Sequence, residues 1–113
     1  MTARKLEFGK FVRKRRMRLM PAVTLRAFAA RIYISPTYLS KIERGDFDPP
    51  AEDIINRIAE ELDCNRDHLL ALAGKVSSDV LEIIKNNPVQ IANFLRATKE
   101  LTKEEWVQLQ IDM

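Results

Sequence analysis

Hydrophobic residues recur along the chain at the three- and four-residue spacing of an α-helix, and no segment shows the alternation of a β-strand. The first pattern predicts a helix from about Leu6 to Leu19. Pro21 ends it, because proline disfavours a helical residue before it. Thr24 is a suitable N-cap for a second helix. The apolar stripe of that helix consists of Leu25, Phe28, Ala29 and Ile32.

The segment from Ser35 to Gly45 predicts a third helix, which is short. Ser35 caps it, Pro36 suits the first helical position because its missing N–H would be unpaired there, and Gly45 ends it. Leu39 and Ile42 face inward. The outer side carries Thr37, Ser40, Lys41 and Arg44. A helix of this length is not stable alone, so it must depend on its neighbours.

Two further helices complete the first part of the chain. A loop over residues 46–50 precedes a helix from about Ala51 to Leu62, and Asn65 can cap a fifth helix that ends at Gly74. We therefore expect an all-α fold in which residues 1–74 form one five-helix domain.

Residues 75–113 predict a short C-terminal helical extension. Ser77 or Ser78 caps its first helix, Pro88 breaks the pattern, and Thr102 and Glu105 have the spacing of a capping box. These pieces are too short to form an independent core. We expect them to pack on the first domain, on a second copy of the chain or on another protein.

Charge is distributed unevenly along the chain. Residues 1–45 contain twelve Lys and Arg against two Glu, a net charge of +10, whereas residues 46–113 have a net charge of −7, and the chain totals +3. A basic segment beside an acidic remainder favours binding to a polyanion such as nucleic acid. A solvated basic helix with no partner is the alternative.

The composition argues against several other classes of protein. No apolar run is long enough to cross a membrane, and no apolar segment follows the basic start as in a secretory signal. Cys64, the single cysteine, fits a reducing cytoplasm. With His68 as the single histidine, no metal site is expected. We find no cofactor motif and no catalytic constellation, so we expect a cytoplasmic protein that is not an enzyme.

Three segments of the chain, FGKFVRKRR, TLRAFAARIYISPTYLSKIERG and ELDCNRDHLLALAG, resemble one known domain. This is the phage repressor–Cro type helix-turn-helix of the XRE family of bacterial regulators, and the resemblance covers residues 8–74. Ala29 supplies the small residue needed where the two motif helices cross. The turn between them usually contains glycine, but Tyr33 stands there. A left-handed Tyr33 would cost roughly 1–2 kcal/mol.

The resemblance also implies an ion pair between Glu43 and an arginine of the first helix. Alignment favours Arg16, with Arg13 as the weaker candidate. Such a pair would fix the first helix against the third. A purely structural role and an additional phosphate contact by the arginine both remain open.

On this resemblance the partner is double-stranded DNA. The third helix would lie in the major groove while the second crosses the backbone. The residues expected to contact bases are Pro36, Thr37, Ser40 and Lys41. The residues expected to contact phosphates are Thr24, Arg26, Tyr33, Tyr38 and Arg44. Tyr38 fits the rim of the core equally well.

One such domain contacts only a half-site, so we expect a homodimer on an inverted-repeat operator. In this family such a regulator is more often a repressor. The candidate dimer interface contains Phe94, Leu95, Trp106 and Leu109, unless these residues fold back on their own chain. The alternative function is an antitoxin-like module whose tail binds a partner protein and whose DNA binding is autoregulatory.

Overall fold

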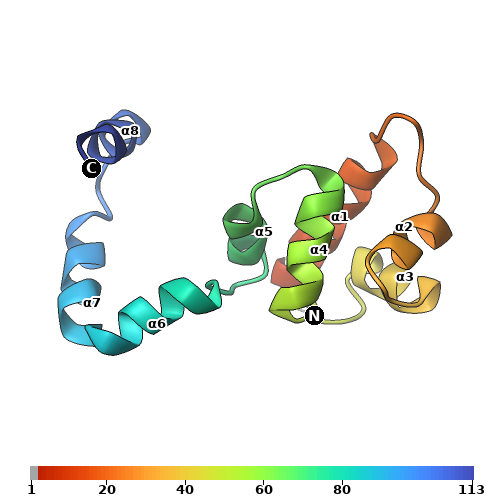
Figure 1. Ribbon diagram of the computed structural model, residues 1–113, viewed down its shortest axis with the longest axis horizontal. Coiled ribbons are helices and arrows are strands. Elements are labelled where there is room, and N and C mark those ends of the chain that lie inside the picture. The colour runs from red at the N-terminus through yellow and green to blue at the C-terminus, as the bar shows by residue number, and fades with distance from the viewer. Residues whose placement is uncertain (1–2) are drawn as a thin grey trace. The chain divides into compact units, whose positions relative to one another are not determined.

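The computed structural model describes residues 3–113, which form eight α-helices and no β-strand (Figure 1). The expectation of an all-α fold is therefore confirmed. The chain divides into two compact units, of which the first ends at Ser77 and the second comprises Ser78–Met113. Each unit is described separately below.

The first unit contains five helices. They are α1 (Ala3–Met17), α2 (Leu25–Arg31), α3 (Pro36–Arg44), α4 (Glu52–Leu62) and α5 (Arg66–Leu72). Helix α1 packs against α3, α4 and α5, and α2 packs against α3, beside which it lies in Figure 1. Every helix contributes to one core. Its most deeply buried side chains are Phe8, Val12, Phe28, Ile32, Leu39, Ile42, Ile55, Ile58, Leu69 and Leu70.

The predicted bounds of the first helix were wrong at both ends. Helix α1 begins earlier, at Ala3, because the alanine and basic residues before Leu6 are good helix formers. It ends at Met17, since the amides of Arg18 and Leu19 turn back to the carbonyls of Arg15 and Arg16 in a tighter, i to i+3 pattern. Leu19 still packs against the core, but from the loop.

The predicted helix caps of the first unit are confirmed. The hydroxyl of Thr24 accepts a hydrogen bond from the amide of Ala27, and that of Ser35 accepts one from the amide of Tyr38. Gly45 ends α3 in the left-handed conformation, with φ of 77°. These local signals fix where α2 and α3 begin and where α3 ends.

The turn between α2 and α3 contains a strained residue. Tyr33 has a φ of 61°, in the left-handed region, and its side chain is exposed. From α4, the guanidinium of Arg57 lies 5.3 Å from the centroid of the tyrosine ring, and its Nε donates a hydrogen bond of 3.0 Å to the carbonyl of Ile32. The contacts of Arg57 thus stabilise a turn in which glycine is usual and Tyr33 stands instead.

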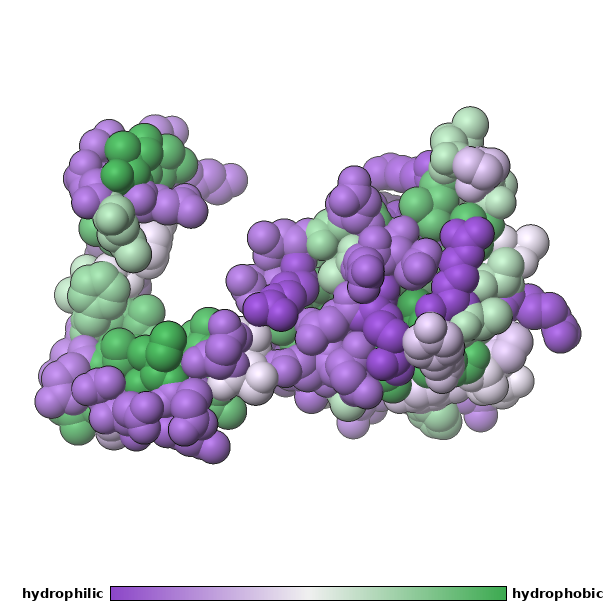
Figure 2. Space-filling view, in the orientation of Figure 1, coloured by the Kyte–Doolittle hydropathy of each residue, from purple (hydrophilic) through white to green (hydrophobic). Residues whose placement is uncertain are grey.

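The second unit contains α6 (Ser78–Asn86), α7 (Pro88–Ala97) and α8 (Lys103–Asp112). The predicted capping box is confirmed, since Thr102 and Glu105 exchange both hydrogen bonds. None of the hydrophobic residues of this unit is buried, and green apolar surface is visible on it in Figure 2. The expectation that these helices form no core of their own is confirmed. The exposed large apolar residues are Val80, Leu81, Ile83, Val89, Phe94, Leu95, Trp106, Val107, Ile111 and Met113.

Candidate nucleic-acid interface

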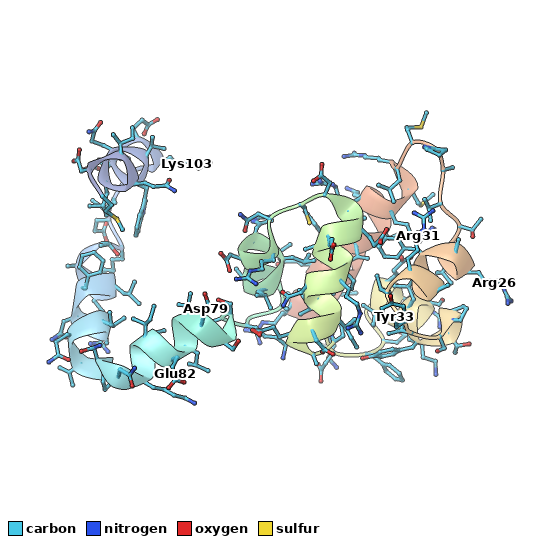
Figure 3. All side chains as sticks on the ribbon, in the orientation of Figure 1. Arg26, Arg31, Tyr33, Asp79, Glu82 and Lys103 are labelled. Atoms are coloured by element: carbon cyan, nitrogen blue, oxygen red, sulfur yellow. The ribbon has the colours of Figure 1, made fainter. Side chains whose placement is uncertain are left out.

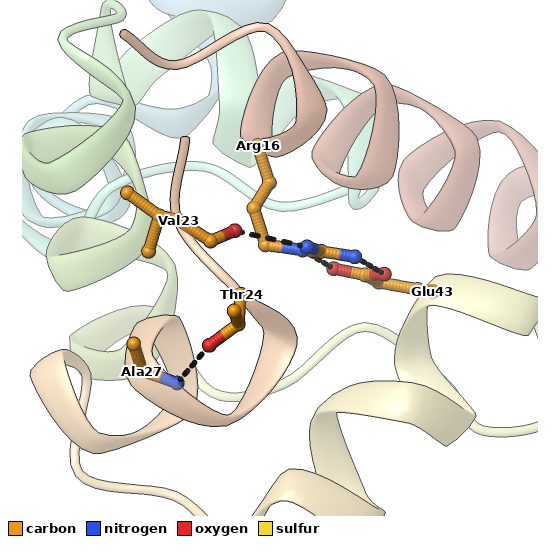
Figure 4. A network of polar contacts seen from close by, with 5 residues as sticks. All are labelled: Arg16, Val23, Thr24, Ala27 and Glu43. Atoms are coloured by element: carbon orange, nitrogen blue, oxygen red, sulfur yellow. Dashed lines mark hydrogen bonds and ion pairs between the residues drawn. The ribbon is translucent and has the colours of Figure 1, made fainter. Parts of the chain in front are cut away.

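A buried ion pair joins α1 to α3. The Nε of Arg16 donates to one carboxylate oxygen of Glu43 at 2.8 Å, and its second terminal nitrogen donates to the other at 2.9 Å (Figure 4). A third hydrogen bond, of 3.2 Å, runs from Arg16 to the carbonyl of Val23. The side chains of Arg16 and Glu43 are only 10% and 3% exposed. The arginine opposite Glu43 is therefore Arg16 and not Arg13.

The Arg16 guanidinium of this pair is positively charged at neutral pH. The hydrogen bond to Glu43 raises the pKa of the Arg16 guanidinium above its ordinary value. Because the pKa of Arg16 is higher in the folded protein than in the unfolded chain, the pair stabilises the fold fully at a pH below the unfolded-state pKa. This stabilisation is lost only as the pH rises through the folded-state pKa. The bidentate geometry also restricts how α3 can rotate against α1.

The backbone of α3 approaches α1 closely at Gly9. A Cβ atom there would collide with the carbonyl oxygens of Ile42 and Glu43. Gly9 was not singled out from the sequence, because a glycine inside a helix is usually destabilising and gives no sign of a close contact. Together with the ion pair, this contact holds the inner side of α3 and leaves its outer side to solvent.

The residues predicted to contact bases all lie on α3. Thr37 is exposed, whereas Pro36, Ser40 and Lys41 are half-buried. Leu39 and Ile42 point to the opposite side and are buried in the core. Helix α3 thus exposes its polar side to solvent while its opposite side is packed in the core.

The residues predicted to contact phosphates lie on α2, in the turn that follows it and on α3 itself. Thr24 and Arg26 lie at the start of α2, and in Figure 3 the side chain of Arg26 points outward from the first unit. Tyr33 is exposed in the turn, and Arg44 is exposed at the end of α3. The Nε of Arg44 lies 3.3 Å from a carboxylate oxygen of Asp46, so that its charge is partly compensated.

Tyr38 has the features of a residue at the rim of the core. It is half-buried and packs against the core cluster. Its ring centroid lies 6.0 Å from that of Phe47, in the loop after α3. A contact of its hydroxyl with phosphate remains a prediction.

Two residues beside this surface were not among those predicted to contact DNA. Arg13 lines a small pocket with Ser40 and Arg44, and Arg16 and Glu43 also line it. Phe47 is 43% exposed, and its ring centroid lies 5.0 Å from the Nζ of Lys41. The signal for Phe47 was present in the sequence, since it is the one large apolar residue in the loop over residues 46–50.

The residues predicted for a dimer interface lie in the second unit. Phe94 and Leu95 are exposed on α7, and Trp106 is exposed on α8. Leu109 is half-buried and lines a shallow hollow on α8 with Trp106 and Met113. These side chains leave apolar surface on both helices.

Comparison with known proteins identifies the fold and the family. The structure resembles the crystal structure of the clp gene regulator ClgR from Corynebacterium glutamicum, with a TM-score of 0.53 and 22% sequence identity over 82% of this chain and 94% of that one. A family model described as a helix-turn-helix domain matches residues 9–75, more than half of the chain. No curated protein matches the sequence significantly.

The chain therefore belongs to the helix-turn-helix domain family, and its resemblance to XRE-type regulators is confirmed. It is a DNA-binding transcriptional regulator, and its motif helices are α2 and α3. Within residues 3–113, every helix is too short or too polar to span a lipid bilayer.

Proposed function

We propose that this protein binds a specific operator in double-stranded DNA as a homodimer and represses transcription there. The observation that carries the proposal is the presentation of α3. Its inner side is fixed by the core and by the Arg16–Glu43 pair, and its outer side carries Thr37, Ser40 and Lys41.

These side chains have the chemistry that base recognition needs. The ammonium of Lys41 can donate to O6 and N7 of guanine, and Thr37 can donate a hydrogen bond or present its methyl group to thymine. Pro36 has no donor and offers apolar contact. A rigid scaffold favours such recognition because the contacting atoms are already close to their bound positions.

Phosphate contacts would fix the position of α3 in the groove. We assign them to Thr24, Arg26, Tyr33, Tyr38 and Arg44. As the cap of α2, the hydroxyl of Thr24 accepts a hydrogen bond from the amide of Ala27. The proton of the hydroxyl therefore remains available for donation to a phosphate oxygen. These contacts supply affinity that depends on salt and not on sequence.

The homodimer is proposed because one α3 spans only a half-site. Two copies related by a twofold axis would contact an inverted repeat, with half-sites about one helical turn apart. The second unit offers the surface for this association, since Phe94, Leu95 and Trp106 are exposed. Residues 1–74 would then be the DNA-binding domain, and residues 75–113 the dimerisation element.

Selection of bound sequences from a random duplex pool tests the proposal. We expect enrichment of an inverted repeat, and sedimentation should show two chains on one selected duplex. A pool with no enriched sequence would contradict specific binding. Stable co-purification with a different protein, with no binding to a second copy, would favour the antitoxin-like module instead.

A further inference from the structure

Phe47 forms a cluster with two residues of α3. Its ring lies 6.0 Å from that of Tyr38, at an interplanar angle of 51°, and 5.0 Å from the Nζ of Lys41. Phe47 does not belong to the hydrophobic core of the first unit, and 43% of its surface is exposed. An exposed aromatic ring between two aspartates is not explained by packing alone.

The two aspartates that flank Phe47 are paired with other cations. A carboxylate oxygen of Asp46 lies 3.3 Å from the Nε of Arg44, and one of Asp48 lies 3.4 Å from the Nζ of Lys5. Among the contacts of Lys41 given by the structure, the aromatic ring is therefore the one that restrains its ammonium. A carboxylate in that place would add a negative charge that offsets the positive charge of Lys41. An aromatic ring attracts the ammonium but carries no net charge, so the positive charge of Lys41 is not offset.

Restraint of the lysine has a consequence for recognition. A lysine side chain has four rotatable bonds, and their freedom is lost when the ammonium is fixed on one base. A ring that holds the ammonium beforehand reduces that loss for the base within reach. It also makes other positions of the ammonium less accessible, so it favours one base over its neighbours.

We propose that Phe47 is a positioning residue for DNA recognition. Its ring holds Lys41 and thereby sets the base preference at the position that Lys41 contacts. This inference rests on the proposed function, in which the outer side of α3 binds bases. Tyr38 supports the arrangement by packing between the core and the ring of Phe47.

The test uses the full chain, a duplex selected from the random pool, and duplexes with each single base-pair change. Phe47→Leu keeps an apolar side chain but removes the aromatic face, and Phe47→Trp keeps that face. We expect Phe47→Leu to weaken binding to the selected duplex roughly two- to fivefold. The preference of Phe47→Leu for one base pair over the others should decrease only at those positions of the duplex where Lys41→Ala abolishes the preference.

Three variants separate this role from a structural one. In a Lys41→Ala background, Phe47→Leu should change base discrimination no further. Phe47→Trp should restore the wild-type preference, and Asp48→Asn, in the same loop, should leave it unaltered. Denaturation curves of Phe47→Leu and Phe47→Trp should coincide with that of the wild type, because Phe47 lies outside the core.

Two results would overturn the inference, and they are distinguishable. If Phe47→Leu weakens all duplexes equally, or changes nothing, the ring does not position Lys41, although the proposed function stands. If the wild-type protein prefers no duplex over any other, the proposed function fails and this inference fails with it.

Discussion

The two units of this chain use their hydrophobic residues in opposite ways. In the first unit, side chains from all five helices meet in a core. In the second, three helices of similar length leave every large apolar side chain at least partly exposed. A short amphipathic helix is stable only when its apolar face is covered. The helices of the first unit cover each other's apolar faces, whereas in the proposed dimer a second copy of the chain covers those of the second unit.

The strongest test of the first unit is loss of its buried ion pair. Glu43→Ala leaves Arg16 as an uncompensated buried charge, which typically costs about 3–5 kcal/mol of the free energy of unfolding. Urea denaturation of the full chain measures this. Asp48→Asn, which removes an exposed ion pair, is the control and should cost at most about 1 kcal/mol. Equal effects would show that the Arg16–Glu43 pair does not hold the first unit together.

The second unit is tested by placing a charge on its apolar surface. Leu95→Asp should weaken self-association at least about tenfold, because burial of a leucine contributes about 1.5–3 kcal/mol and a buried carboxylate adds a desolvation cost. Sedimentation equilibrium measures the dissociation constant. Asn93→Asp adds the same charge two residues earlier on α7, where the side chain is also exposed, and it should have little effect. If Leu95→Asp leaves association unchanged, another surface forms the dimer.

The smallest expected effect concerns the turn between α2 and α3. Tyr33→Gly removes left-handed strain of roughly 1–2 kcal/mol, although it also loses the contact of the ring with Arg57, worth about 0.5–1 kcal/mol. Tyr33→Ala loses the contact and keeps the strain. The free energy of unfolding should therefore rank glycine above tyrosine and tyrosine above alanine. A glycine variant no more stable than the alanine variant would contradict strain at this position.

Local chemistry explains why much of the first unit could be predicted from the sequence. The caps at Thr24, Ser35 and Asn65 and the end of α3 at Gly45 depend on residues within a few positions of each other. Buried Leu39 and Ile42 follow from helical spacing. The Arg16–Glu43 pair spans 27 positions and was implied by the family resemblance, not by spacing.

The remaining features depend on contacts between distant segments. Gly9 has its role because α3 passes close to it, and helical periodicity does not encode that approach. Phe47 was assigned to a loop by its proline neighbours, which gave no indication that its ring would lie against Lys41. The start of α1 was predicted too late because the apolar pattern begins only at Leu6 and the first turn of α1 contains no acidic residue. For the second unit, periodicity predicted the helices but not the partner of their apolar faces.

The central claim is that the outer side of α3 distinguishes bases while its surroundings bind the backbone. Fluorescence anisotropy with a selected duplex and a scrambled one, at several salt concentrations, tests it directly. Lys41→Ala should lose roughly 1–3 kcal/mol on the selected duplex and little on the scrambled one. The matched control, Arg26→Ala, should weaken both duplexes alike and reduce the salt slope by about one. A Lys41→Ala variant that keeps the full preference for the selected duplex would contradict the account.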